Sequence, residues 1–249
     1  MIEDGALENP HVEAIAMLHV DSRLDVGTIG VTPGPVNAAA DEFYLTIRGS
    51  GGHGGYPHSA IDAIPAASAI VLALQNIVSR ETDPLASAVV TVGTIAGGYR
   101  NNVIADEVTL SGTLRAHDSL VREELEARLR RIVAGVACAY NVQAEVRVLH
   151  GYPPVHNNLA LAAEFARYVR SHSSLQVEEP PPTMGAEDFA YFAQRVPGLL
   201  IRLGVRSEAS GAVHPGHSAL FRIDEGALPL GISTLVLFAI AVTSGEISL

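Results

Sequence analysis

The histidines of this chain stand out as residues whose type and spacing could do chemistry. The segment GSGGHGGYPH, residues 49–58, surrounds His53 with five glycines. Because glycine has no side chain, a loop rich in it can approach another group without clashes. An imidazole ring can serve as acid, base or hydrogen-bond donor near neutral pH. His53 is therefore a residue whose role in this loop needs an explanation.

The same segment allows two other interpretations. Gly49, Gly51 and Gly54 fit G-x-G-x-x-G after an alternating strand, which is the context of a dinucleotide-binding loop. Such a loop runs directly into a helix whose N-terminus meets the pyrophosphate. Here Pro57 and the residues after it intervene, so the match to a nucleotide site is weak. A surface hairpin with an incidental histidine is the second alternative.

Other candidate side chains lie further along the chain. His19 ends the apolar run AIAMLHV, His214 and His217 occur in AVHPGHSALF, and Glu187 precedes Asp188 in MGAEDF. Each also has an ordinary structural explanation. A histidine at the end of a buried strand is more often a core residue than a ligand, and acidic residues favour helix N-termini. Taken singly, none of them identifies a site.

Two more polar residues belong to the segment NNVIADEVTLSGTLRAHD. Asn102 could be a turn residue, and Arg115 could be a solvated charge on a strand. The chain has no G-x-S-x-G motif. Its single cysteine, Cys138, lies in a helical pattern and is a poor candidate for a nucleophile.

The pattern of apolar residues predicts the elements that position these side chains. An alternating strand over 41–47 precedes a helix over 62–80, two strands in SAVVTVGTIAGG and EVTLSGTLRA, a helix capped by Asp118 or Ser119, and the strand QAEVRVLHG. This βαββαβ order is that of a ferredoxin-like unit. The segments before and after it cannot each form a core, so we expect one domain inserted into another. The predicted boundaries are 1–37, 38–151 and 152–249.

Composition restricts the class of partner. The chain has 249 residues, with 27 acidic and 16 basic side chains and a net charge of -11, which disfavours nucleic acid and anionic membranes. A single cysteine and no secretory signal indicate a cytoplasmic protein. Residues 226–245 carry no charge and are long enough to span a bilayer. Proline, glycine and hydroxyl residues in their first half favour a buried helix instead.

Several motifs in order identify a resemblance. MIEDGALENP, LHV, GSGGHGGYPH, NNVIADEV, GTLRAHD, TMGAEDFAYF and HSALFRIDEGALPLG resemble the latter two-thirds of the di-metal amidohydrolases that include aminoacylases, hippurate hydrolase and auxin-conjugate hydrolases. The resemblance implies a partial zinc-peptidase-like α/β catalytic domain with an inserted ferredoxin-like lid, which also forms a homodimer. It implies hydrolysis of the amide bond of N-acyl amino acids or small peptides by two divalent metal ions, zinc or alternatively manganese, cobalt or nickel.

The resemblance also assigns roles to residues. It places His53 in the partner subunit's active site as an oxyanion donor, together with Asn102, and it makes Arg115 a binder of the substrate carboxylate. His19 and His217 match metal ligands, with His214 as the alternative to His217. Glu187 matches a residue at the substrate-binding rim.

The remaining metal ligands and the catalytic glutamate of the family lie upstream of the position that Met1 matches. A catalytic zinc site usually needs three protein ligands, so we expect this chain alone to bind metal poorly. The alternative to an enzyme is a truncated, inactive dimerisation scaffold. The preferred acyl group, amino acid and metal are not readable from the sequence.

Overall fold

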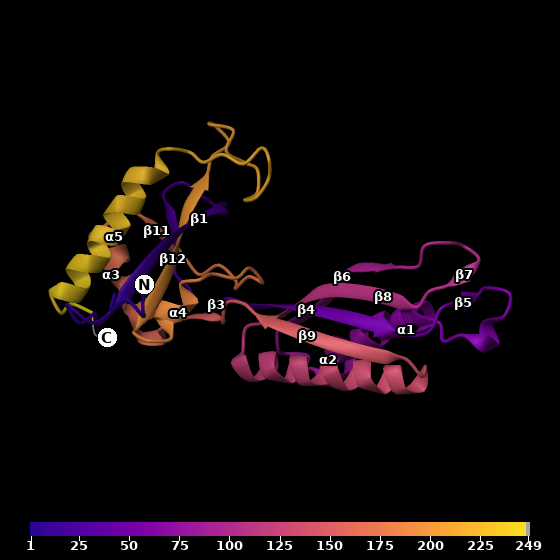
Figure 1. Cartoon of the computed structure of the whole chain (residues 1–249). Coiled ribbons are helices and arrows are strands. Elements are labelled where there is room, and N and C mark those ends of the chain that lie inside the picture. Colours follow the sequence, from indigo (N-terminus) through magenta and orange to yellow (C-terminus); the bar gives the residue numbers. More distant parts are fainter. Residues whose placement is uncertain (248–249) are drawn as a thin grey trace. The chain divides into compact units, whose positions relative to one another are not determined.

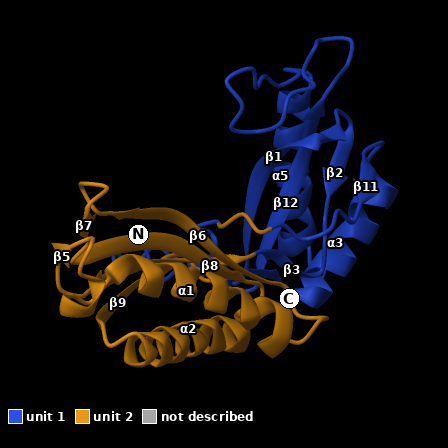
Figure 2. Cartoon of the chain, turned by 90° about the vertical axis from the view of Figure 1, so that its right-hand side faces the viewer, with its two compact units in different colours: residues 1–37, 155–183, 187–249 blue, residues 38–154, 184–186 orange. Residues whose placement is uncertain are grey.

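The computed structural model describes residues 1–247, which divide into two compact units (Figure 1, Figure 2). Unit 1 contains residues 1–37, 155–183 and the stretch from residue 187 onward, and unit 2 contains residues 38–154 and 184–186. Unit 2 thus ends three residues later than the expected segment and also includes residues 184–186. The backbone amide of Ala38 donates to the carbonyl of Gly185 at 2.9 Å, and Arg115 donates to that of Met184 at 3.1 Å. These bonds tie the short segment to unit 2.

Unit 2 is an antiparallel sheet with two helices on one face (Figure 2). In chain order its main elements are β4 (Ala39–Arg48), α1 (Ala63–Asn76), β6 (Ala88–Gly97), β8 (Glu107–Ala116), α2 (Ser119–Ala139) and β9 (Gln143–His150). The strands lie in the order β6-β8-β4-β9. The predicted βαββαβ order and the mixed α/β class are therefore confirmed.

Local sequence explains why these elements form. Phe43, Leu45 and Ile47 on β4 are fully buried or nearly so, while the residues between them face outward. Period-two alternation of this kind is typical of a sheet with one covered face. Both helices begin at an aspartate: Asp62 accepts a hydrogen bond from the amide of Ile64, and Asp118 accepts from those of Leu120 and Val121.

Small elements close one end of the unit 2 sheet. They are β5 (Gly52–His53), the short 3-10 helix η1 (Pro57–Ser59) and β7 (Val103–Ile104), with β5 and β7 paired antiparallel. Gly49 and Gly54 are required here because a Cβ on either would press on a backbone carbonyl, that of Ile61 or Asn102. No helix follows the glycines directly, since α1 begins only at residue 63. The nucleotide-loop interpretation is therefore wrong.

One helical stretch in the described residues, Ala63–Glu81, is long and apolar enough to cross a membrane. It consists of α1 and a π-helical extension, η2 (Ile77–Glu81). Its inner stripe, which includes Ile70, Leu74 and Ile77, is completely buried in the core of unit 2. Its apolar character thus serves packing against the sheet. The uncharged stretch 226–245 forms the shorter helix α5 instead.

Unit 1 has a four-stranded sheet in the order β1-β12-β2-β11. Its elements are β1 (Ile15–Asp25), β2 (Thr28–Gly30), β3 (Gly34–Asn37), β10 (Val155–Asn157), α3 (Leu159–His172), β11 (Gln176–Glu178), α4 (Ala190–Ala193), β12 (Gly198–Arg206) and α5 (Ala227–Thr243). β1 is parallel to β12, and β12 is antiparallel to β2. β3 and β10 form a separate two-stranded ribbon.

Both faces of β12 are covered. Leu199, Ile201 and Leu203 join the core that contains α3 and α5. Leu200 points to the other face, where it packs with Phe189 and other apolar side chains beside α4. β1 lies at the edge of the sheet, and its first four residues are only partly buried although all are apolar. The face that carries Leu200 becomes polar two residues further along β12.

Candidate functional site

A cluster of charged side chains occupies the polar part of this face. His19 on β1 is in register with Arg202 on β12, and Asp21 follows His19 on the same face. Glu187, from the segment before α4, lies 3.8 Å from His19 between Oε2 and Nε2. The structure thus brings together two of the predicted site residues, His19 and Glu187, from sequence positions 168 residues apart.

The hydrogen bonding of His19 orients its ring for binding. Nδ1 lies 2.8 Å from the carbonyl oxygen of Val20 and must donate its proton there, because a carbonyl can only accept. Nε2 then carries the lone pair of the neutral ring and faces Glu187. A backbone-anchored imidazole beside a carboxylate is an arrangement that suits binding of a cation.

Glu187 lies in a partly enclosed position. Burial raises its pKa, a hydrogen bond with Asp188 raises it further, and the nearby His19 acts in the opposite direction. The side chain is 18% exposed, compared with 44% for His19. A carboxyl group with a raised pKa beside an imidazole can exchange protons more readily near neutral pH than an ordinary glutamate.

Arg202 and Asp21 are part of this cluster and were missed by sequence reasoning. Arg202 is 8% exposed and Asp21 is 5% exposed. Arg23 binds Asp21 through Nε at 2.9 Å and Nη2 at 2.6 Å. One sequence feature could have revealed Arg202, namely its position inside the apolar run LLIRLG. An arginine buried in such a run requires specific partners, which would have directed attention to a polar cluster.

His217 belongs to the segment between β12 and α5. It occupies an exposed turn between β12 and α5 with a left-handed φ of 63°, and the adjacent Gly216 amide donates to Ser22 Oγ at 3.2 Å. Over residues 1–247, no three His, Cys, Asp or Glu side chains are grouped so that they could hold a metal ion. These residues therefore do not by themselves fit a catalytic zinc site, which takes three protein ligands.

His53 and Asn102 meet at the end of unit 2. His53 pairs with Val103 across the β5–β7 ribbon, and the amide of Gly54 donates to the carbonyl of Asn102 at 2.8 Å. The amide of Gly55 donates to Nδ1 of His53 at 3.0 Å. Nδ1 is therefore an acceptor and Nε2 carries the proton, so the exposed imidazole presents a hydrogen-bond donor to whatever binds there.

Arg115 lies at the end of the four-stranded sheet of unit 2 that is away from the β5–β7 ribbon. It is half-buried on β8, in register with Ala40 at the start of β4, whereas Arg48 at the other end of β4 pairs with Glu107. Eight residues of strand separate Glu107 from Arg115, or about 26 Å at 3.3 Å per residue. The His53 end, with β5 and β7, lies beyond Glu107 (Figure 1). One subunit's own His53 and Arg115 cannot both contact a small substrate.

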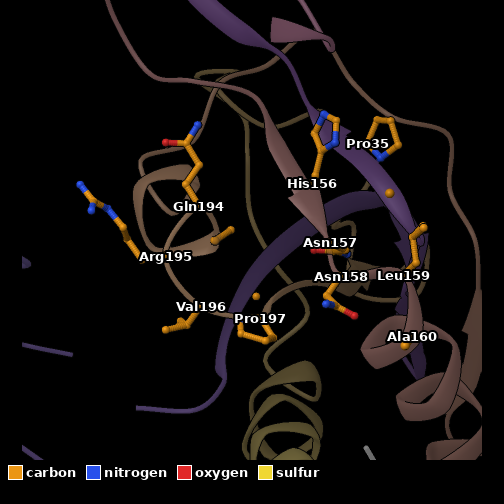
Figure 3. Close-up of a pocket in the computed structure, with 13 residues that line it drawn as sticks. Pro35, His156, Asn157, Asn158, Leu159, Ala160, Gln194, Arg195, Val196 and Pro197 are labelled. Atoms are coloured by element: carbon orange, nitrogen blue, oxygen red, sulfur yellow. The ribbon is translucent and has the colours of Figure 1, made fainter. Parts of the chain in front are cut away.

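A separate surface pocket of unit 1 has a volume of about 810 Å³. Gln194 and Arg195 lie on one side of it, and His156 and Asn158 lie on the other (Figure 3). Gly198, at the beginning of β12, also lines it. Arg202 lies four residues further along this strand, about 13 Å away. The pocket therefore does not include the His19 cluster.

Comparison with known families and structures agrees with the fold. The family described as "Peptidase dimerisation domain" matches residues 39–140, which form most of unit 2. A crystal structure from methicillin-resistant Staphylococcus aureus, described as an aminohydrolase, has a TM-score of 0.87 and 33% identity, and the match covers 95% of this chain and 61% of that one. A dinuclear metal-binding peptidase of the M20 family from Bacillus subtilis has a TM-score of 0.80 and 29% identity, with 97% and 60% covered.

Two curated relatives have higher sequence identity to this chain than these two crystal structures have. N-acetyl-L-cysteine deacetylase from Bacillus subtilis is 38% identical over 228 residues, which cover 92% of this chain and 53% of that protein. IAA-amino acid hydrolase ILR1-like 2 from Arabidopsis thaliana is 41% identical over 236 residues, which cover 93% of this chain and 53% of that protein. The chain thus spans about half the length of these relatives. On its fold, its dimerisation domain and these similarities, the chain belongs to the M20 family of amidohydrolases and peptidases.

Proposed function

We propose that this chain forms part of a metal-dependent amidohydrolase that cleaves the amide bond of N-acyl amino acids or small peptides. The two curated relatives support this proposal, since both names denote hydrolysis of an amino-acid derivative. The reported relatives give no support to the alternative of an inactive scaffold. The preferred substrate within this class is left open.

The proposed roles of individual residues come from the resemblance to the family. His53 donates a hydrogen bond from Nε2 to the oxygen on which negative charge develops, and Asn102 beside it assists. Arg115 binds the substrate carboxylate through its guanidinium. Glu187 lines the substrate site and exchanges a proton near the reacting bond. His19 and His217 contribute to binding two divalent ions in the intact enzyme, with zinc, manganese, cobalt or nickel as candidates.

The observation that carries the proposal is the separation of His53 from Arg115 within one unit 2. Because about 26 Å of strand lies between these two ends, both residues can serve one substrate only if they come from different subunits. We therefore propose a homodimer in which His53 of one subunit completes the active site of the other.

Of the two edge strands of the unit 2 sheet, one is suited to pairing with a second subunit. β6 is an edge strand with no charged residue from Ala88 to Gly97, and its Ile95 is 53% exposed. The opposite edge, β9, carries Glu145 and Arg147, which discourage pairing with another strand. The β6 edge, with helix α1 beside it, is therefore the proposed contact between subunits.

The proposed function can be tested by mixing two inactive variants of an enzyme preparation that hydrolyses N-acyl amino acids. His53→Ala and His19→Ala are each expected to lower the rate of N-acyl amino acid hydrolysis about 10²-fold or more. After subunit exchange, half of the dimers are mixed, and each mixed dimer has one site with both histidines intact. The mixture should then regain about one quarter of the wild-type rate. His11→Ala, which removes an exposed histidine outside both clusters, is the control and should stay active.

Two results would contradict the proposal. A mixture that remains as inactive as its parents, despite demonstrated subunit exchange, would exclude action of His53 across the interface. A preparation that hydrolyses other substrates but no N-acyl amino acid or dipeptide would exclude the proposed substrate class.

A further inference from the structure

Arg202 is a buried cation in the middle of an otherwise apolar strand. Every residue of β12 except the last is buried, and Arg202 itself is 8% exposed. We infer that Arg202 is a positioning residue that anchors the segment starting at Thr183 and so holds Glu187 opposite His19. This inference rests on the function proposed above for the His19–Glu187 pair.

The contacts of the guanidinium define what it anchors. Nη2 donates to Oδ1 of Asn37 at 2.9 Å and makes longer contacts of 3.4 Å to Oγ1 of Thr183 and to the carbonyl of Val36. The amide of Thr183 also donates to that carbonyl, at 3.0 Å. The guanidinium therefore caps the place where Thr183 joins the end of β3.

The guanidinium holds the start of this segment, while the Ala38 amide and Arg115 bind the carbonyls of Gly185 and Met184 further along it. Between the isolated bridge at Thr183 and helix α4, no residue belongs to a strand or helix. Glu187 lies four residues after Thr183, and its position opposite His19 depends on where the segment begins. A displacement at Thr183 would be passed along irregular backbone to the carboxyl group.

The charges agree with this role. The nearest acid to Arg202 is Asp21, at 3.8 Å from Nη1, and Asp21 is already bound by two nitrogens of Arg23. Burial lowers the pKa of Arg202, while Asp21 and Glu187 both oppose that effect. The buried cation and Glu187 thus attract each other, and moving either one away would remove part of this compensation.

Amide measurements on the full chain test the inference without any activity assay. In Arg202→Met, the amide of Thr183 is expected to exchange with solvent about tenfold faster or more, because its surroundings lose the guanidinium anchor. The NMR signal of the Asp188 amide, which donates to Oε1 of Glu187 at 3.1 Å, should shift as well. Global thermal stability should change little, because an apolar side chain replaces a buried charge.

Arg206→Met is the matched control, because it removes an arginine from the same strand. Arg206 pairs with Asp25 and Glu208 at the surface, so its loss should leave the Thr183 and Asp188 amides as in wild type. Should Arg202→Met not fold, Asn37→Ala removes the main acceptor of the guanidinium and should release the same two amides.

The inference is overturned if the foldable variant leaves both amides unchanged. It is also overturned if exchange accelerates equally throughout unit 1, since that would indicate a purely structural role. Failure of the proposed hydrolytic function would leave these amide measurements unaffected, so the two hypotheses are tested separately.

Discussion

Breaking the ion pair between Asp41 and Arg122 should destabilise unit 2 severely. Asp41, near the start of β4, is 2% exposed. It accepts hydrogen bonds from Arg122 Nε at 2.7 Å, from Arg122 Nη2 at 2.5 Å and from the amide of Gly151 at 3.0 Å. In Arg122→Met, the carboxylate keeps the Gly151 amide but loses its main countercharge.

The magnitude follows from burial. Removing one partner of a buried pair leaves an uncompensated charge and costs about 3–5 kcal/mol. Because Arg122 is 18% exposed, water can partly solvate the Asp41 carboxylate once the guanidinium is gone. We therefore expect a loss of stability at the lower end of this range, about 3 kcal/mol. With a urea m-value of about 1.5 kcal/mol/M, the denaturation midpoint of unit 2 should fall by about 2 M. Arg48→Met is the matched control at the far end of the same strand.

Arg48 pairs with Glu107 at 3.0 Å and Glu145 at 3.1 Å, but its side chain is 49% exposed. Exposed pairs contribute little to stability, so this control should move the midpoint much less than Arg122→Met does. The two variants differ in burial rather than in the type of interaction. Equal shifts for both would refute the argument from burial.

The pH dependence gives a second measurement on the same pair. Burial by itself would raise the pKa of Asp41, but the hydrogen bonds and charge of Arg122 outweigh it and lower the pKa in the folded state. The stabilisation is therefore complete above the unfolded pKa of about 3.9 and is lost as pH falls through the lower folded value. Urea midpoints measured between pH 7 and pH 3 should show this loss in wild type and a smaller one in Asp41→Asn. A midpoint of Asp41→Asn that falls as steeply as wild type would show that other carboxylates are responsible.

The remaining predictions concern packing, assembly and metal. Gly112→Ala should cost about 3 kcal/mol in urea denaturation, because its Cβ would collide with the Thr91 carbonyl and the Phe43 ring, whereas Gly135→Ala, in open space on α2, should stabilise by about 0.5–1 kcal/mol. Equal effects would contradict this packing. Ile95→Lys on the β6 edge should convert the proposed dimer to monomer in sedimentation, while Arg147→Ala on β9 should not; the reverse result would place the interface on β9. Calorimetry should show zinc binding weaker than about 1 μM, and tighter binding that is lost in His19→Ala would be inconsistent with an incomplete ligand set.

The elements of unit 2 could be predicted because local rules decide them. Alternation of apolar residues sets β4, and aspartate caps set the starts of α1 and α2 within one or two residues. The glycine loop was identified as a place where backbone approaches closely, and Gly49 and Gly54 do so. The roles of His53, Asn102 and Arg115 came from family resemblance and remain predictions.

The candidate site of unit 1 could be predicted only in part. His19 and Glu187 were recognised by their motifs, but their contact depends on a segment of irregular backbone that no periodicity describes. Arg202 and Asp21 were not predicted as site residues, because a charged residue in a strand is normally expected to face solvent. Their burial arises from pairing with residues distant in sequence, Asn37 and Thr183 among them.

The sequence by itself determined the order of elements, the inserted ferredoxin-like unit and the family, because these depend on neighbouring residues and ordered motifs. Tertiary structure alone decided which charges are buried together and how far apart the candidate site residues lie. Burial and separation are properties of chain packing: the pairing of β4 with β8 puts Arg115 at the end of the sheet away from the β5–β7 ribbon that carries His53. The pairing of β1 with β12 likewise puts Arg202 beside His19.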